Sequence, residues 1–386
     1  MAVSNFHGGG LTLQRVAADS LFRFDALISV GGFGRLFAAA EKANFLSQQI
    51  DLPLDRLPSR LRLLRRLKPW LRRRASILNM EAQIAWGHLT RIIGHRTPRL
   101  LVCPQGYISV RLTSRAVEEL GAQYITWVMD DHPLKFGGAS MRYRADYEAQ
   151  WRDHLQKAHK IYVISDAMRE FYRDMFGVDS DVLHGALPLR ADTSAAASPR
   201  RANQGVRLGY AGSLSGWQQD PLELLADVAR GVGAELHVAG HELPRWLLKP
   251  AAVYRGQLAP EQAREMLAEC DAVILPVSFS PEYTAMSRLN VATKLSELCA
   301  CGRPILAIGP ADAAMTRILL EHGAAVCVTS LSRKDLAMGV TSVLDKNVSR
   351  RVTANARRLF EKELNLENMQ RRWQEAADWL FGSSLP

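Results

Sequence analysis

The sequence predicts an α/β protein built from two parallel sheets, each wrapped by helices. The first observation is that short apolar, β-branched runs alternate with helical patterns along most of the chain. The second is that residues 191–205, rich in Ala, Ser, Pro and charge, interrupt this alternation as a linker would. The third is a length of 386 residues with 47% hydrophobic and 23% charged side chains, which suits two cores and excludes disorder.

Five strands are predicted on each side of the linker. Those before it are Val3–Phe6, Ala26–Val30, Leu100–Cys103, Tyr124–Met129 and Lys160–Ser165. Those after it are Val206–Tyr210, Glu235–Ala239, Ala272–Pro276, Pro304–Ile308 and Ala325–Val328. Only helical pattern follows the last strand. We therefore expect one domain over residues 1–190, a second over 206–365, and a helix over 366–386 that crosses back to the first.

Composition narrows the class further. No uncharged apolar run approaches the roughly 18 residues that span a bilayer, and the first residues lack the pattern of a signal peptide. The cysteines are five in number and include no C-x-x-C pair, so neither a zinc site nor a disulfide framework is indicated. We expect a cytoplasmic protein with reduced thiols. Because no suitable loop contains an Asp-x-Asp, we also expect no metal, and the alternative is a metal held by Asp130 and Asp131.

The positive charge is concentrated in the first half of the chain. The net charge is +10, with 27 basic and 18 acidic residues in 1–190 against 22 and 21 in 191–386. Such asymmetry indicates that one domain meets a polyanionic surface, either a nucleic acid or an anionic membrane.

One basic segment favours the membrane. Its nine positive charges, with no acidic residue among them, are Arg56, Arg60, Arg62, Arg65, Arg66, Lys68, Arg72, Arg73 and Arg74. Leucines recur there every three or four residues, although Pro69 divides the segment, so one helical face is apolar and the rest cationic. The alternative is a core helix with a solvated basic face. We expect a peripheral site on the inner membrane face, with Arg65, Arg66, Trp70, Arg72 and Arg73 toward the lipid.

The stretch TKLSELCACGRPILAIGP, residues 293–310, is the most informative in the chain. Together with YAGSL, VAGHE, YRGQLAPEQAREMLAECDAVILPVSFS and the earlier VISDAMREFYRDMFG, it resembles the GT-B glycosyltransferases, most closely glycosyltransferase family 4. The resemblance runs from Lys160 to Arg303. It implies two Rossmann-like domains facing a cleft, with a nucleotide-sugar donor on the second and the acceptor mainly on the first. The expected membrane location suits a lipid-linked or cell-surface glycan as that acceptor. The resemblance also implies a retaining hexosyltransferase that needs no cofactor.

The resemblance assigns donor-binding roles. Glu297 matches a carboxylate that accepts hydrogen bonds from the ribose hydroxyls, and its alternative is a solvated partner of Lys294. The family's second glutamate, eight residues earlier, is replaced by Leu289, and the loop GSLSGWQQD lacks the usual basic pair. The groups left for the diphosphate are Arg288, Lys294 and the backbone of Gly212 and Ser213; surface charge is the alternative for the two side chains.

Two loops of the first half carry further candidates. Gly9 and Gly10 belong to FHGGGLTLQRV, which we interpret as a glycine turn facing the donor phosphates or, alternatively, a plain tight turn. Asp130, Asp131 and His132 follow a buried strand, where unpaired charges are costly to bury. We expect them to activate the acceptor hydroxyl or bind the transferred sugar; the alternative is a helix cap supplied by Asp131.

Two other functions remain open. Gly32 and Gly34 follow a strand, as in an NAD-dependent oxidoreductase, but the third glycine position is Phe37, and only Asp51 or Asp55 offers the acidic residue. A non-catalytic nucleic-acid-binding protein would explain the basic half, yet the basic residues lack interleaved aromatics. We therefore predict a glycosyltransferase that does not bind nucleic acid.

Overall fold

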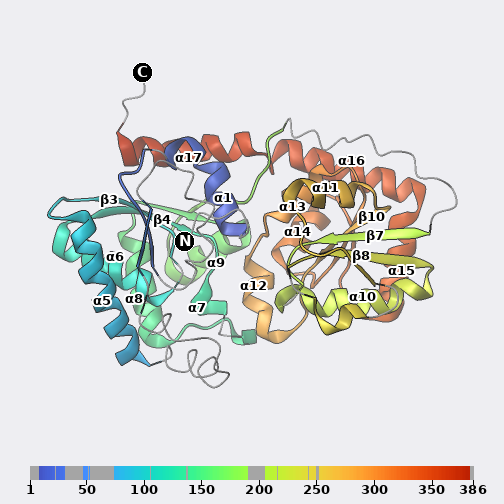
Figure 1. The fold of residues 1–386 in the computed structure, drawn as a ribbon, viewed down its shortest axis with the longest axis horizontal. Helices are drawn as coiled ribbons and strands as arrows, with labels where there is room; N and C mark the ends of the chain where they lie inside the picture. Colours follow the sequence, from blue (N-terminus) through green and yellow to red (C-terminus); the bar gives the residue numbers. More distant parts are fainter. Residues whose placement is uncertain are drawn as a thin grey trace. The chain divides into compact units, whose positions relative to one another are not determined.

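The computed structural model describes residues 8–21, 23–30, 47–50, 52, 74–104, 106–135, 138–189, 205–214, 216–241, 243–248 and 252–382. These residues form two compact units (Figure 1). Unit 1 holds the chain up to Leu134, Arg142–Leu183 and the part from Gln370 onward, whereas unit 2 holds Lys135–Met141 and His184–Met369. Among the helices of the described ranges, none has both the length and the apolar character needed to cross a bilayer.

Unit 1 contains two parallel sheets. A two-stranded sheet pairs β1 (Leu27–Val30) with β2 (Ser47–Ile50), and a four-stranded sheet has the order β3 (Arg99–Val102), β4 (Gln123–Val128), β5 (Lys160–Val163) and β6 (Asp181–Val182). The helices are α1 (Gly8–Val16), α2 (Ala18–Leu21), α5 (Ala75–Ile93), α6 (Tyr107–Leu120), α7 (His132–Lys135), α8 (Ala145–Lys157) and α9 (Asp166–Phe176). Parallel pairing throughout fits strands joined by crossover helices.

Unit 2 has one six-stranded parallel sheet. Its strands are β7 (Val206–Ala211), β8 (Ala234–Ala239), β9 (Ala252–Tyr254), β10 (Ala272–Pro276), β11 (Ile305–Ile308) and β12 (Val326–Val328). Its helices are α10 (Gln219–Gly231), α11 (Pro260–Ala268), α12 (Thr284–Leu289), α13 (Lys294–Ala300), α14 (Ala314–Glu321), α15 (Arg333–Leu344) and α16 (Lys346–Lys362). The sheet order is β12-β11-β10-β7-β8-β9, so the chain winds outward in both directions from β7 and β10. This is the doubly wound order of a Rossmann domain.

The last helix, α17 (Leu366–Phe381), packs within unit 1 from Gln370 onward. The Trp373 indole donates to the Ser20 hydroxyl at 3.0 Å, and the Tyr162 hydroxyl donates to the Arg372 carbonyl at 3.2 Å. The Trp379 ring stacks on His159 at 4.4 Å between centroids. Its apolar face, spaced every three or four residues, is buried as that pattern predicts.

The starts of α9, α15 and α16 are capped by polar side chains. The Ser165 hydroxyl accepts from the Met168 amide at 3.0 Å and begins α9. Ser332 and Asp345 cap α15 and α16 in the same way. Each cap satisfies an amide that the helix itself leaves without a partner.

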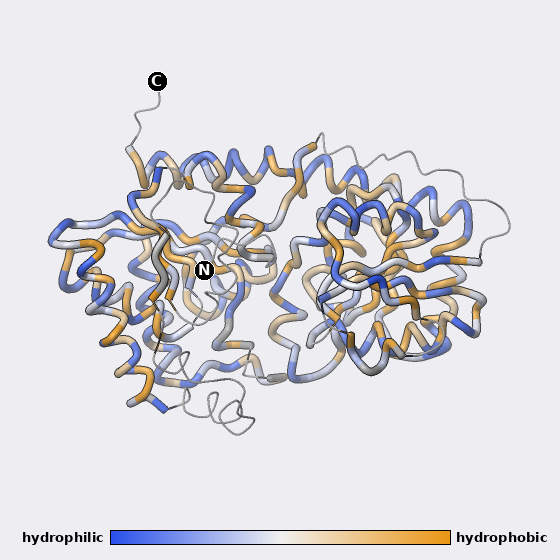
Figure 2. The backbone as a smooth tube through the Cα atoms, in the orientation of Figure 1, coloured by the Kyte–Doolittle hydropathy of each residue, from blue (hydrophilic) through white to orange (hydrophobic). Residues whose placement is uncertain are grey.

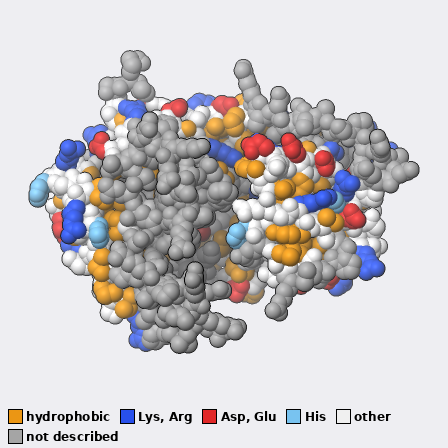
Figure 3. Space-filling model, in the orientation of Figure 1, with side chains coloured by type: hydrophobic (Ala, Val, Ile, Leu, Met, Phe, Trp, Pro, Cys, Tyr) orange, Lys and Arg blue, Asp and Glu red, His pale blue; other side chains and the backbone are white. Residues whose placement is uncertain are grey.

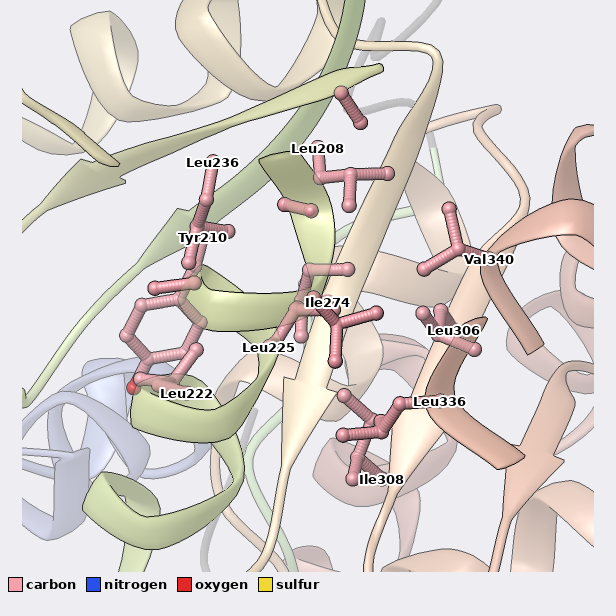
Figure 4. Close-up of a cluster of buried hydrophobic side chains, with 14 of the residues drawn as sticks. Leu208, Tyr210, Leu222, Leu225, Leu236, Ile274, Leu306, Ile308, Leu336 and Val340 are labelled. Atoms are coloured by element: carbon pink, nitrogen blue, oxygen red, sulfur yellow. The ribbon is translucent and has the colours of Figure 1, made fainter. Parts of the chain in front are cut away.

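The core of unit 2 lies between the sheet and the helices α10 and α15 (Figure 4). Leu208 and Tyr210 of β7 alternate onto this face, where they meet Leu222 and Leu225 of α10. Apolar residues follow the strands and the inner faces of the helices (Figure 2). Over unit 2 in Figure 3 acidic, basic and apolar side chains are interspersed.

The α/β fold class is confirmed. The five strands predicted after the linker are present within one residue of their predicted bounds, and four of the five before it are present as well. Val3–Phe6 lies outside the described residues. The strands β2, β6 and β9 were not predicted. β2 reads SQQI, which is polar, and the other two have only two or three residues.

Candidate functional site

The carboxyl ends of β7 and β10 mark the point where the sheet order of unit 2 reverses. Loops that follow neighbouring strands diverge at such a point, and ligands of doubly wound sheets bind there. Backbone bonds hold the two loops together: the Ser278 amide donates to the Trp217 carbonyl at 2.7 Å. The Phe279 amide donates to the Asp220 carboxylate at 2.8 Å. Hydrogen bonds therefore fix the segments that follow β7 and β10 relative to each other.

Lys294 brings a cation to this edge. It is the first residue of α13 and donates from Nζ to the Tyr210 hydroxyl at 2.6 Å. The ammonium lies 4.4 Å from the centroid of the Tyr210 ring. Burial lowers the pKa of Lys294 to about 8, and Glu297 one turn later opposes this shift. An ammonium with a lowered pKa is incompletely compensated, so a phosphate group would stabilise its charge.

Gly212, directly after β7, makes room for that ammonium. Its φ is +149°, and a Cβ placed there would lie 2.4 Å from Lys294 Nζ. The Gly212 amide donates to the Ala239 carbonyl at 2.9 Å, so this residue contributes space rather than a donor. The carbonyl of Ser213 accepts from the Tyr210 hydroxyl at 2.6 Å. The loop, the strand and α13 therefore meet at one point.

The other donor-site candidates lie on α12 and α13. Glu297 is half-buried on the first turn of α13. Arg288, in the last turn of α12, is exposed and forms an ion pair with Asp312 at 3.0 Å. Leu289, which stands where the family has a glutamate, is buried, so no carboxylate occupies that position.

Asp131 of unit 1 is tied to protein donors. It is 5% exposed and caps α7, because its Oδ1 accepts from the Leu134 amide at 3.1 Å. Its Oδ2 accepts from the Tyr172 hydroxyl at 2.7 Å and also from the Tyr143 hydroxyl. Burial raises the pKa of Asp131 to about 6 although these three bonds lower it. The geometry favours the capping alternative for this residue.

The neighbouring candidates are placed as follows. Asp130 is half-exposed at the carboxyl end of β4, and His132 begins α7. Gly9 and Gly10 lie in the first turn of α1, so the predicted turn ahead of the helix is wrong: the glycines are helical. Helix starts tolerate glycine because the first amides have no partner within the helix.

Several predicted sites fall outside the described residues. These are Gly32, Gly34, Arg65, Arg66, Trp70, Arg72 and Arg73. The sequence reasoning missed Tyr210, Tyr143 and Tyr172, the hydroxyls that hold Lys294 and Asp131. The signal for Tyr210 was its place two residues before the glycine of YAGSL at a strand end. Nothing in the local sequence points to the two tyrosines of unit 1.

Comparison with known proteins gives one family match and several structures of similar fold. The family described as glycosyl transferase-like matches residues 214–378. A search among curated protein sequences gives no match. Among solved structures, sucrose-phosphate synthase from Thermosynechococcus elongatus aligns with a TM-score of 0.66 at 14% identity, over 98% of this chain and 94% of the other. HepE from Anabaena, in complex with UDP and glucose, aligns with a TM-score of 0.64 at 15% identity, over 97% and 96%.

A third structure, a glycosyltransferase from Rickettsia africae, aligns with a TM-score of 0.64 at 11% identity, over 98% of this chain and 96% of the other. The two-unit α/β fold and the family match together define a GT-B glycosyltransferase. The family match covers residues 214–378, and the solved structures show a GT-B fold over nearly the whole chain.

Proposed function

We propose that the chain transfers a hexose from a UDP-sugar to a lipid-linked or cell-surface glycan, with retention of configuration at the anomeric carbon. The observation that carries the donor assignment is the Lys294 ammonium, held at the switch point between β7 and β10 by the Tyr210 hydroxyl at 2.6 Å. The choice of UDP is supported by HepE, whose solved complexes contain UDP, glucose and UDP-glucose.

In this proposal Lys294 binds the diphosphate. Its charge stabilises the negative charge that grows on the leaving nucleotide as the anomeric bond breaks. Glu297 accepts hydrogen bonds from the ribose hydroxyls, which fixes the nucleotide along α13. Arg288 serves the phosphates only by exchanging its ion pair with Asp312, a solvent-exposed pair of small net value. Gly9, Gly10 and Ser213 supply backbone contacts.

The acceptor chemistry belongs to Asp130 and His132 in this proposal. One of these groups receives the proton of the acceptor hydroxyl, or hydrogen-bonds the sugar, as the new bond to the anomeric carbon forms. Asp131 keeps the loop in place through Leu134, Tyr143 and Tyr172. Its oxygens are engaged by these donors, which supports catalysis without a metal held by the Asp130–Asp131 pair.

The membrane assignment rests on the sequence of residues 56–74. We propose that Arg65, Arg66, Arg72 and Arg73 bind anionic headgroups on the inner face of the membrane, with Trp70 at the interface. A lipid-linked acceptor would then be presented at the same surface.

A thermal-shift panel tests the donor assignment. UDP, GDP, dTDP, CMP and NAD are compared, because a ligand at about 100 times its dissociation constant stabilises the folded state by about 2.7 kcal/mol. UDP should stabilise the wild-type protein most, and Lys294→Met should remove that shift. A response to NAD alone would favour the oxidoreductase alternative.

Turnover is tested with UDP-glucose, by measuring UDP release. Alanine at Asp130 or His132 should lower turnover by roughly a hundredfold or more while the affinity for UDP changes little. If both variants keep normal turnover, the acceptor chemistry lies elsewhere.

A further inference from the structure

Tyr210 is fixed at both ends. Its ring is 1% exposed and lies in the core of unit 2 with Leu222 of α10 and Leu236 of β8 (Figure 4). Its hydroxyl lies at the edge of the sheet, where it bonds Ser213 of the loop after β7 and Lys294 of α13. A buried aromatic ring has little rotational freedom, so the position of its oxygen is set by the core.

The polarity of the hydroxyl is fixed as well. Its only hydrogen goes to the Ser213 carbonyl at 2.6 Å, so its lone pairs are left for the Lys294 ammonium at 2.6 Å. Burial raises the pKa of Tyr210, which keeps the phenol neutral and its hydrogen in place. The phenol therefore acts as an oriented acceptor for a cation.

The remaining space around the ammonium is narrow. The missing side chain of Gly212 leaves Nζ beside the loop backbone, where a Cβ would stand 2.4 Å away. The Tyr210 ring is also close to the ammonium, with 4.4 Å between Nζ and the ring centroid. A long, flexible lysine side chain is thus held in one place before any ligand binds.

We propose that Tyr210 is a positioning residue for the donor site: its phenol aims the Lys294 ammonium at the diphosphate of the nucleotide sugar and keeps it charged. The inference rests on the proposed binding of a nucleotide diphosphate by Lys294. It adds to that function the residue which orders the cation in advance.

The test is the substitution Tyr210→Phe, which keeps the ring and removes the acceptor. UDP affinity is measured by calorimetry between pH 6.5 and pH 9.5. At pH 7 the variant should bind UDP roughly ten- to a hundredfold more weakly, the range for a lost hydrogen bond to a charged group. In the wild type, affinity should fall as pH rises through about 8, where Lys294 loses its proton. In the variant that fall should begin at lower pH. Without the phenol oxygen the ammonium form of Lys294 is less stable, so Lys294 loses its proton at a lower pH.

A double-mutant cycle isolates the pathway. In a Lys294→Met background, Tyr210→Phe should change UDP affinity less than twofold, because its effect passes through the ammonium. The matched control is Tyr254→Phe, which removes a 2.7 Å hydrogen bond from a phenol to the Gly240 carbonyl in the same sheet. That variant should keep both the affinity and its pH dependence, and thermal unfolding should verify that every variant is folded.

The outcomes separate the two claims. If Lys294→Met weakens UDP binding but Tyr210→Phe leaves affinity and pH dependence unchanged, the role of Tyr210 is overturned and the donor site stands. Tyr210 would be only a core residue if Tyr210→Phe lowered UDP affinity by the same factor at every pH. The same would follow if it lowered UDP affinity as much in the Lys294→Met background as in the wild type. If the wild type binds no nucleoside diphosphate, the proposed function fails and the positioning role fails with it.

Discussion

Gly185 touches the backbone of Thr293, the residue that precedes Lys294. A Cβ on Gly185 would lie 2.7 Å from both the Cα and the Cγ2 of Thr293. The segment after unit 1 is also fastened in unit 2 through Leu187, whose carbonyl accepts from the Leu366 amide at 2.8 Å. The start of α13 is therefore located partly by a stretch of chain more than a hundred residues away.

Gly185→Ala should displace the start of α13. We expect the variant to lose about 1 to 3 kcal/mol of unfolding free energy, the usual range for overpacking, and to bind UDP more weakly because Lys294 moves. Gly231→Ala is the control, since a Cβ at Gly231 meets nothing within 4 Å. Chemical denaturation and calorimetry with UDP measure the two effects. Unchanged stability and affinity in Gly185→Ala would show that Thr293 moves to make room for the Cβ without displacing Lys294.

Asp131 should make unfolding depend on pH in a direction opposite to most carboxylates. Its pKa rises from 3.8 to about 6 on folding, so the folded state binds the proton more tightly than the unfolded state. The contribution is therefore fully present below about pH 4 and is lost as pH rises through 6. Relative to Asp131→Asn, the wild type should gain up to roughly 3 kcal/mol between pH 7 and pH 4.

Thermal unfolding of both proteins across this pH range measures the difference, and the Asn variant cancels the titration of the other groups. A difference that stays constant, or that shrinks toward acid, would contradict the buried, tyrosine-bonded state of Asp131.

Glu297→Ala should weaken nucleotide binding without unfolding unit 2. The expected loss is roughly 1.5 to 3 kcal/mol of binding free energy, as for hydrogen bonds to a charged partner. Glu321→Ala serves as the comparison, because Glu321 is an exposed helix residue paired with Arg317 at 3.9 Å. Calorimetry with UDP should find the loss in the first variant alone. Equal affinities for the two variants would assign Glu297 to the solvated surface.

The basic segment should bind anionic vesicles. Each Lys or Arg near an anionic leaflet contributes about 1 kcal/mol, so several of the nine can hold the protein at the membrane. Flotation with anionic and neutral liposomes, at low and high salt, measures the binding. Replacing Arg65, Arg66, Arg72 and Arg73 by Glu should abolish flotation and leave UDP binding intact. If the wild-type protein does not float with anionic vesicles at low salt, the proposed membrane site is wrong.

The fold of unit 2 could be predicted closely because its strands are buried on both faces. A run such as AVILP at β10 is apolar throughout and follows the polar Asp271, so its start is visible in the sequence. β9 was missed because an edge strand of three residues has no period to detect. In unit 1, β2 was missed because its sequence SQQI has no apolar pattern. Its pairing with β1 is made by the backbone, which leaves no signal in the side chains.

The site was predictable where its residues share a motif. Lys294 and Glu297 lie one turn apart on one helix, and that spacing is local. The tyrosines around Asp131 lie 12 and 41 residues away in the chain, so tertiary packing alone brings them there. Asp131 itself has the sequence environment of an active carboxylate, and only burial distinguishes its capping role.

The route of the chain through the two units sets an order for synthesis. Unit 1 needs residues from Gln370 onward, whereas unit 2 has all its parts once Met369 has been made. At about 5 to 20 residues per second, the roughly 190 residues between Leu183 and Gln370 take about 10 to 40 s to translate. During that time the surfaces that Trp373 and Trp379 will cover remain open on the nascent chain. The half that leaves the ribosome first is thus completed last, and it is the half that a chaperone would have to shield.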